Sequence, residues 1–170
     1  MNEKEAMQAR VYQILFVTEG SWIEQKVTSM LQDSEGCSFS VRKMVPSPHI
    51  TTHLNFCKWD VILWDLSNST EQDLDALKNV CRGNNSFPVI GLVSEGKDQL
   101  GRKAMKFGAV DYLPTNVLRR ELLLRALHYA MGRNRAKGAA GNLPNAGRDV
   151  RDELSCAIDI DGEQQERERT

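Results

Sequence analysis

The carboxylate of Asp65 stands at the end of an apolar run, in the segment WDVILWDLSNST from Trp59 to Thr70. Residues 61–64 are all apolar, and the polar residues that follow Asp65 are typical of a turn. A carboxylate at the end of a buried strand costs free energy unless a neighbouring group stabilises its charge. Asp65 is therefore the first candidate for a functional site.

Asp65 ends the third of five apolar runs that are typical of strands, the others being 11–17, 37–45, 87–93 and 109–113. Apolar residues recur at helical spacing in the intervening segments 21–32, 47–57, 70–81, 97–108 and 116–135. Runs such as DVILW and PVIGLV, apolar on both faces, suit the middle of a parallel sheet covered by helices. The sequence predicts an α/β domain of the flavodoxin-like type, with a doubly wound five-stranded parallel sheet, strand order 2-1-3-4-5 and five helices.

In such a fold, ligands bind at the rim formed by the carboxyl ends of the strands. The residues expected at that rim are Glu19, Asp65, Val93, Ser94 and Thr115. Two of them also have a structural interpretation. Glu19 precedes a helix whose dipole favours an acid, and Ser94 is a candidate N-cap for the helix after it.

Composition limits the function classes. The chain has 170 residues, of which 41 % are hydrophobic and 26 % charged, and these values suit one packed domain. A formal net charge of -1 gives no reason to expect a nucleic-acid or anionic membrane partner. No apolar run approaches the ~20 residues of a membrane span, and the polar N-terminus MNEKEAMQAR is unlike a secretory signal. A cytoplasmic location is expected.

The sequence also lacks the common signatures of an enzyme. We find no nucleophile–base pair and no glycine-rich phosphate loop in it. The four cysteines are far apart, which gives neither a zinc-binding spacing nor a redox pair. We therefore do not expect an enzyme that turns over an outside substrate.

Four segments, in order, resemble the receiver domain of two-component response regulators. WDVILWDLS is similar to the family's third strand, which ends in the phosphoacceptor aspartate, and FPVIGLVSEG is similar to its fourth strand. AMKFGAVDYLP is the most specific match, because family members carry an Ala…Gly-Ala-x-Asp-Tyr-Leu phrase here. ELLLRALHYAMGRNRA is similar to the last helix. The resemblance covers about residues 10–137 and makes Asp65 the candidate phosphoacceptor.

The resemblance also implies a role for each site position. In the family, two acids after the first strand and the acceptor hold a Mg²⁺ ion. A hydroxyl after the fourth strand and a lysine after the fifth bind the phosphoryl oxygens. An aromatic residue, Tyr112 here, moves inward with the hydroxyl and carries the signal to the surface. Phosphoryl transfer of this kind depends mostly on positioning and charge neutralisation.

The chain departs from that pattern at the acidic pair and at the hydroxyl. The acidic pair is replaced by Thr18 and Glu19, so one carboxylate is left. Glu19 and Asp65 are therefore the candidate ligands of a weakly bound Mg²⁺, and no other cofactor is expected. Val93 stands at the hydroxyl position, and Ser94 could replace it only if the strand end shifts by one residue.

The position of the phosphate-binding lysine is also changed. Counting from Tyr112 places Thr115 there, which leaves no positive charge to pair with Asp65. A one-residue deletion would instead make Leu113–Pro114 the equivalent peptide, in the cis form. That register lacks the lysine as well.

We interpret the chain as a degenerate receiver, a regulatory protein-binding module of two-component phosphorelay signalling that is phosphorylated weakly or not at all. The alternative is a working single-domain response regulator, phosphorylated on Asp65 by a histidine kinase. A remote third hypothesis is a flavodoxin-like flavin-binding protein. It would need a phosphate-cradling loop after the first strand, where TEGSWIE supplies Gly20 and Ser21 beside an acid.

The resemblance places a protein partner, or a second copy in a homodimer, on the face made by the fourth helix, the fifth strand and the fifth helix. The last helix has a basic outer face that includes Arg119, Arg120 and Arg125, and a simply solvated face is the other interpretation. Its inward stripe is expected to consist of Leu118, Leu122, Ala126 and Leu127.

The chain divides into three predicted parts. Residues 1–9 form an N-terminal extension, 10–137 the receiver domain and 138–170 a flexible polar tail. The last part is rich in glycine, alanine, asparagine and charged residues, a composition that buries little apolar surface.

Overall fold

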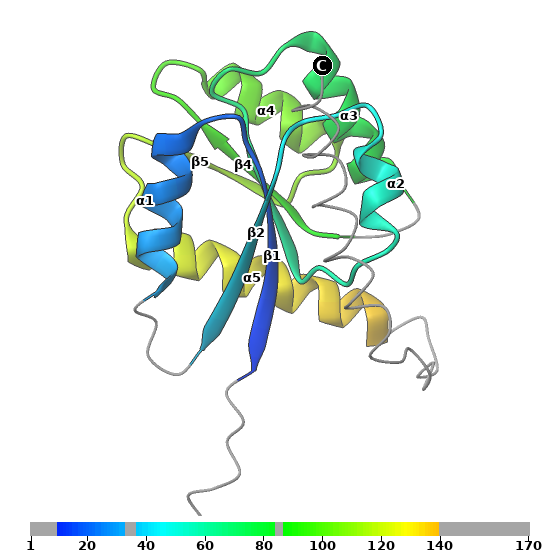
Figure 1. Ribbon diagram of the computed structural model, residues 1–170. Coiled ribbons are helices and arrows are strands. Elements are labelled where there is room, and N and C mark those ends of the chain that lie inside the picture. The colour runs from blue at the N-terminus through cyan, green and yellow to red at the C-terminus, as the bar shows by residue number, and fades with distance from the viewer. Residues whose placement is uncertain (1–9, 33–36, 84–86, 140–170) are drawn as a thin grey trace, which may run out of the picture.

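The computed structural model describes residues 10–32, 37–83 and 87–139. In these ranges, strands alternate with helices, and the sheet runs through the middle of the molecule (Figure 1). The strands are β1 (Val11–Val17), β2 (Ser38–Met44), β3 (Val61–Asp65), β4 (Val89–Val93) and β5 (Asp111–Pro114). The helices are α1 (Ser21–Gln32), α2 (Ile50–Leu54), α3 (Glu71–Arg82), α4 (Asp98–Phe107) and α5 (Arg120–Ala139).

The strands form one parallel sheet in the order β2-β1-β3-β4-β5. This topology confirms the predicted flavodoxin-like fold class. Apolar side chains of α1 and α5 pack on one face of the sheet, and those of α2, α3 and α4 pack on the other. Because the crossover helices cover both faces, β3 and β4 are buried along their whole length, which explains their continuous apolar runs.

One detail of the predicted helix faces is wrong. In α5, Leu122 is 36 % exposed, whereas Leu123 is fully buried and takes its place beside Ala126 and Leu127. In α1, the exposed Trp22 likewise stands next to the fully buried Ile23. Spacing identifies a helix, but the angle at which the helix packs on the sheet decides which of two adjacent residues is buried.

Helix α4 ends at Gly108, as the sequence predicts. Gly108 has a positive φ of 119°, and its N–H donates to the carbonyl oxygens of Ala104 and Met105. A Cβ at Gly108 would lie 3.3 Å from the Cβ of Cys81 on α3. Burial raises the pKa of the Cys81 thiol to about 11, so this thiol is neutral at neutral pH and packs as an apolar group.

The starts of α3 and α4 differ in how they are capped. Thr70 and Asp73 form a reciprocal capping box at the start of α3. At α4 the N-cap is Lys97, with no side-chain hydrogen bond to the helix, so the interpretation of Ser94 as the N-cap is wrong. The side chain of Lys97, in the loop between β4 and α4, therefore does not cap its own helix and can contact another part of the protein.

Helix α5 extends to Ala139, two residues beyond the predicted end of the domain. Residues 1–9 and 140–170, to which the extension and nearly all of the tail were assigned, lie outside the described residues. Among the helices that the structure describes, none combines the length and apolarity that crossing a membrane requires.

Candidate functional site

The predicted site residues lie at the carboxyl ends of four adjacent strands. Asp65 is the last residue of β3, and Thr18 follows β1, which pairs directly with β3. Val93 is the last residue of β4, and Thr115 follows β5. The N–H of Thr115 donates to the Val93 carbonyl over 2.8 Å, so the ends of β4 and β5 are joined.

The Asp65 carboxylate is held by neutral donors. Thr18 Oγ1 donates to Asp65 Oδ2 over 2.8 Å, and the Ser67 N–H donates to Asp65 Oδ1 over 2.9 Å. Asp65 is only 9 % exposed, so these hydrogen bonds offset part of the free energy lost when the carboxylate leaves water. Thr18 is itself held in place, because its Oγ1 accepts from the Gly20 N–H over 2.9 Å.

Glu19 and Gly20 complete the loop after β1. The Glu19 side chain is exposed, and the Asp65 hydrogen bonds described above come from Thr18 and Ser67 instead. A Cβ at Gly20 would lie 3.5 Å from both Asp65 Oδ2 and Thr18 Oγ1. The loop therefore brings a hydroxyl, rather than a second carboxylate, to Asp65.

The positions after β4 and β5 contribute no charged group. Val93 is fully buried and pairs with Pro114, so the strand end is not shifted and Ser94 lies outside the strand. Thr115 is 4 % exposed, and its carbonyl accepts from Lys26 Nζ over 2.9 Å. There is no cis peptide bond in the described residues, so Leu113–Pro114 is trans.

Lys97 brings a positive charge to the loop that follows Asp65. Its Nζ donates to the Ser67 carbonyl, two residues beyond Asp65. Ser67 is 7 % exposed, and its Oγ has no hydrogen-bond partner among the described residues. No sequence pattern indicates this contact, because it joins two loops and depends on their conformations.

Solved receiver domains match this architecture, although no family model and no curated protein matches the sequence. Full-length FixJ from B. japonicum aligns with 72 % of this chain and 58 % of its own, at 18 % identity and a TM-score of 0.62. A response regulator receiver domain from Clostridium thermocellum aligns over 74 % and 98 %, at 23 % identity and a TM-score of 0.60. The chain has the fold of a response regulator receiver domain.

A third receiver structure concerns the metal. The receiver domain of the sensor histidine kinase PA1611 from Pseudomonas aeruginosa, described with a magnesium ion in its active site cleft, aligns over 72 % of this chain and 99 % of its own. Its identity is 20 % and its TM-score 0.57. In this chain's receiver fold, the described residues contain no group of three His, Cys, Asp or Glu side chains that could hold a metal.

Mg²⁺ fits this site poorly. Both Asp65 oxygens already accept hydrogen bonds, and the ammonium of Lys97 is on the neighbouring Ser67 carbonyl. Glu19, the other candidate ligand, is exposed. A hard cation needs several oxygen ligands whose lone pairs face it, and beside Asp65 the loop after β1 offers a hydroxyl that donates to the carboxylate in place of a second carboxylate.

Tyr112, the aromatic position of the receiver pattern, packs against α4. A Cβ built at Gly101 would lie 2.3 Å from Tyr112 Cδ2, so the ring fills the space that any other residue at 101 would need. Tyr112 is partly buried and joins the apolar cluster on that face of the sheet. The structure shows the ring packed on α4, and the signalling role that the resemblance implies for Tyr112 stays a prediction.

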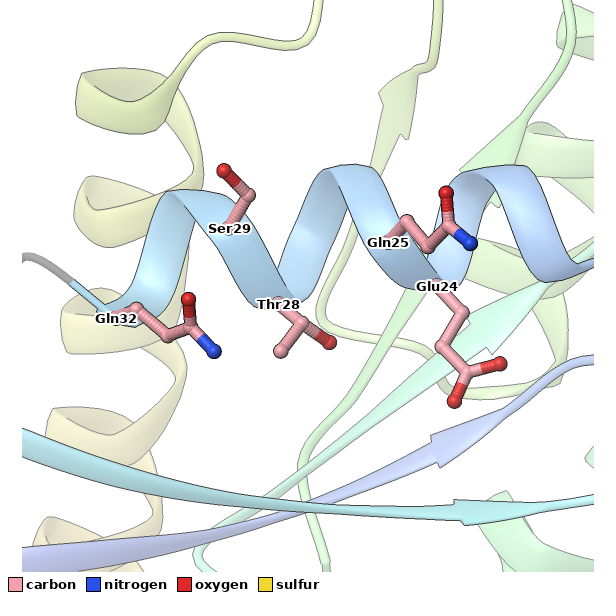
Figure 2. A pocket seen from close by; sticks show the side chains of 5 residues that line it. All are labelled: Glu24, Gln25, Thr28, Ser29 and Gln32. Atoms are coloured by element: carbon pink, nitrogen blue, oxygen red, sulfur yellow. The ribbon is translucent and has the colours of Figure 1, made fainter.

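A separate pocket of about 380 Å³ lies on α1 and does not include Asp65. Its lining residues all come from that helix, and Figure 2 shows them leaving it in more than one direction: Glu24, Gln25, Thr28, Ser29 and Gln32. Because the lining belongs to a single helix and is uniformly polar, we treat it as a surface hollow. The strand ends around Asp65 remain the candidate site.

Proposed function

We propose that this receiver is a regulatory module of two-component phosphorelay signalling that acts by binding a protein partner and is phosphorylated on Asp65 weakly or not at all. The environment of Asp65 carries the proposal. A hydroxyl hydrogen of Thr18 lies on Asp65 Oδ2, and buried Val93 stands where a phosphate-binding hydroxyl is expected. As such a module, the protein would not turn over an outside substrate.

The energetic reason is the lack of groups that neutralise a phosphoryl group. Phosphoryl transfer to a carboxylate brings negative charge into a buried place, and each missing charge-assisted hydrogen bond removes about 1.5–3 kcal/mol. Because about 1.4 kcal/mol corresponds to a tenfold change in rate, losses at Thr18, Val93 and Thr115 together amount to several orders of magnitude. Regulation through a partner does not need that chemistry.

The partner is proposed to bind the face made by α4, β5 and α5. Strand β5 is at the edge of the sheet, and apolar side chains are exposed on both helices. Met105 of α4 is 41 % exposed, and Leu122 and Tyr129 of α5 are 36 % and 57 % exposed. Exposed aromatic and apolar side chains beside basic residues are typical of protein interfaces, including those between two copies of one chain.

The alternative is a working response regulator, phosphorylated by an upstream histidine kinase. One observation favours it, which is that Asp65 keeps a carboxylate at the end of β3, at the carboxyl edge of the sheet. Nothing in the structure favours the flavin-binding hypothesis over these two. The first two hypotheses predict opposite results in one experiment.

That experiment is intact-protein mass spectrometry after incubation with acetyl phosphate and Mg²⁺. The wild type, Asp65→Asn and a conventional receiver domain as positive control would be treated in the same buffer. We expect a phosphoryl adduct on most of the conventional receiver and on little or none of the wild type. An adduct on the wild type as extensive as that on the conventional receiver, and absent from Asp65→Asn, would contradict the proposal and favour the working regulator.

A further inference from the structure

Lys97 connects the loop after β4 with the loop after β3. Its backbone is fixed by two hydrogen bonds, from its own N–H to the Ser94 carbonyl over 3.1 Å and from the Leu100 N–H to its carbonyl over 2.9 Å. Its Nζ donates to the Ser67 carbonyl, and the Ser67 N–H donates to Asp65 Oδ1. Ser67 therefore links the Lys97 ammonium to the Asp65 carboxylate. Its carbonyl accepts one hydrogen bond, and its N–H donates the other.

The position of Lys97 is unfavourable for its own helix. Lys97 is the N-cap of α4, where the helix dipole repels a positive charge. The best N-cap residues accept a hydrogen bond from the helix backbone, and a lysine ammonium has no acceptor to offer. The structure accordingly shows no side-chain cap, and the ammonium points to Ser67. Lys97 is an exposed residue, and its contact with Ser67 offsets part of this cost.

At Asp65, in contrast to the start of α4, a nearby positive charge is favourable. The carboxylate is 9 % exposed, and its hydrogen bonds come from the neutral groups of Thr18 and Ser67. Lys26, another cation at this rim, is bound to the Thr115 carbonyl over 2.9 Å and lies 5.9 Å from the Trp22 ring centroid, away from Ser67. Lys97 is the described cation that reaches the loop holding Asp65.

We propose that Lys97 is the built-in cation of the Asp65 site, and that its ammonium stabilises the ionised carboxylate through Ser67 so that the fold needs no divalent metal there. The buried Ser67 Oγ, which lacks a partner, is consistent with a site adapted from another set of contacts. A divalent ion bound to Asp65 and the Ser67 carbonyl would have to displace the ammonium. This inference rests on the proposed function, a receiver module with little or no phosphorylation.

A double-mutant cycle tests the proposal. Urea unfolding would be followed by tryptophan fluorescence, to which the fully buried Trp64 contributes, for the full-length wild type, Lys97→Met, Asp65→Asn and the double variant. Methionine keeps the aliphatic stem and removes the charge. We expect Lys97→Met to raise the unfolding equilibrium constant about fivefold in the wild type and less than twofold in the Asp65→Asn background.

Two controls separate charge from loop packing. Lys103 is exposed on α4, and Lys103→Met is expected to change the unfolding constant less than twofold in both backgrounds. Lys97→Arg keeps a cation and should recover most of the loss. Equal effects of Lys97→Met in the two backgrounds would overturn the proposal, because a simple tether between loops does not depend on the charge of residue 65.

Magnesium gives an independent measurement if Asp65→Asn proves too unstable to compare. The wild-type unfolding midpoint should be the same in ~10 mM MgCl₂ as in KCl of equal ionic strength, because a ligand that binds only the folded state would raise it. Stabilisation of the wild type by Mg²⁺ would overturn the proposal. Labelling by acetyl phosphate tests the proposed function in a separate experiment. A failure of the Lys97 proposal can therefore be distinguished from a failure of the proposed function.

Discussion

At the scale of single residues, Thr18 determines what the Asp65 site can do. A hydroxyl at this position donates to the carboxylate, whereas a second carboxylate would repel it and would need a cation between the two. With Thr18 in place, the contact is a hydrogen bond between a neutral donor and the carboxylate, and it needs no cation. Under the proposed function, this arrangement makes Asp65 less suited to accept a phosphoryl group.

Thr18→Val should therefore destabilise the fold. The substitution keeps the shape of a fully buried residue but leaves Asp65 Oδ2 and the Gly20 N–H without the Thr18 hydroxyl. Hydrogen bonds to charged groups contribute about 1.5–3 kcal/mol, and we expect a loss in that range in urea unfolding. Thr18→Ser, which keeps the hydroxyl, should lose clearly less. Equal losses in the two variants would show that packing, not the hydrogen bond, is what matters.

The residue scale is also where sequence reasoning was least complete. Asp65 and Thr18 could be placed because each follows a strand, and parallel strands bring their carboxyl ends to one edge. Lys97 could not, because no spacing rule relates residues on two different loops. Its contact with Ser67 depends on the conformation of the turn that begins at Ser94 and contains Gly96, whose φ is +77°.

At the scale of elements, the junction of α4 and β5 depends on Gly101. Glycine in the interior of a helix is destabilising by roughly 0.5–1 kcal/mol relative to alanine. Here the missing side chain makes room for Tyr112, whose ring carbons Cδ2 and Cγ would lie 2.3 and 2.5 Å from a Cβ. Gly101 lowers the intrinsic stability of α4, but it allows Tyr112 of β5 to pack against this helix.

Gly101→Ala should therefore destabilise the protein, because the clash with Tyr112 outweighs the better helix propensity. Gly132 is the matched control, since it lies inside α5 and a Cβ there meets nothing within 4 Å. We expect Gly132→Ala to stabilise the fold by roughly 0.5–1 kcal/mol in thermal or urea unfolding. In a Tyr112→Ala background, Gly101→Ala should also become stabilising. If it destabilised in that background as well, the ring would not be the cause.

The existence and order of the elements followed from the sequence, because period and chain connectivity are local properties. Their ends did not always follow. The last helix was predicted from residue 116 and begins at Arg120, although Leu118, which precedes it, is buried. Burial of an apolar residue near a helix start does not require helical backbone, and only the packing of β5 against α5 fixes where the helix begins.

At the scale of the whole molecule, the two apolar clusters of the described residues draw on all five helices and on the sheet. Helix α5 supplies Leu123, Leu127 and Ala130 to the cluster on its face of the sheet, and all three are fully buried. Burial of a leucine side chain contributes about 1.5–3 kcal/mol. Because a domain of this size has a free energy of unfolding of only about 5–15 kcal/mol, loss of α5 would remove much of it.

The fragment 10–139 should therefore fold as stably as the full chain, whereas a fragment that ends at residue 119 should not fold. In reducing buffer, we expect the thermal midpoint of 10–139 to lie within about 4 °C of the full chain, a difference of less than about 1 kcal/mol. The shorter fragment should lack cooperative unfolding in circular dichroism, because removing α5 exposes one face of the sheet. A large drop in the midpoint of 10–139 would mean that the segments beyond it stabilise the receiver fold, and the domain boundary predicted near residue 137 would then be wrong.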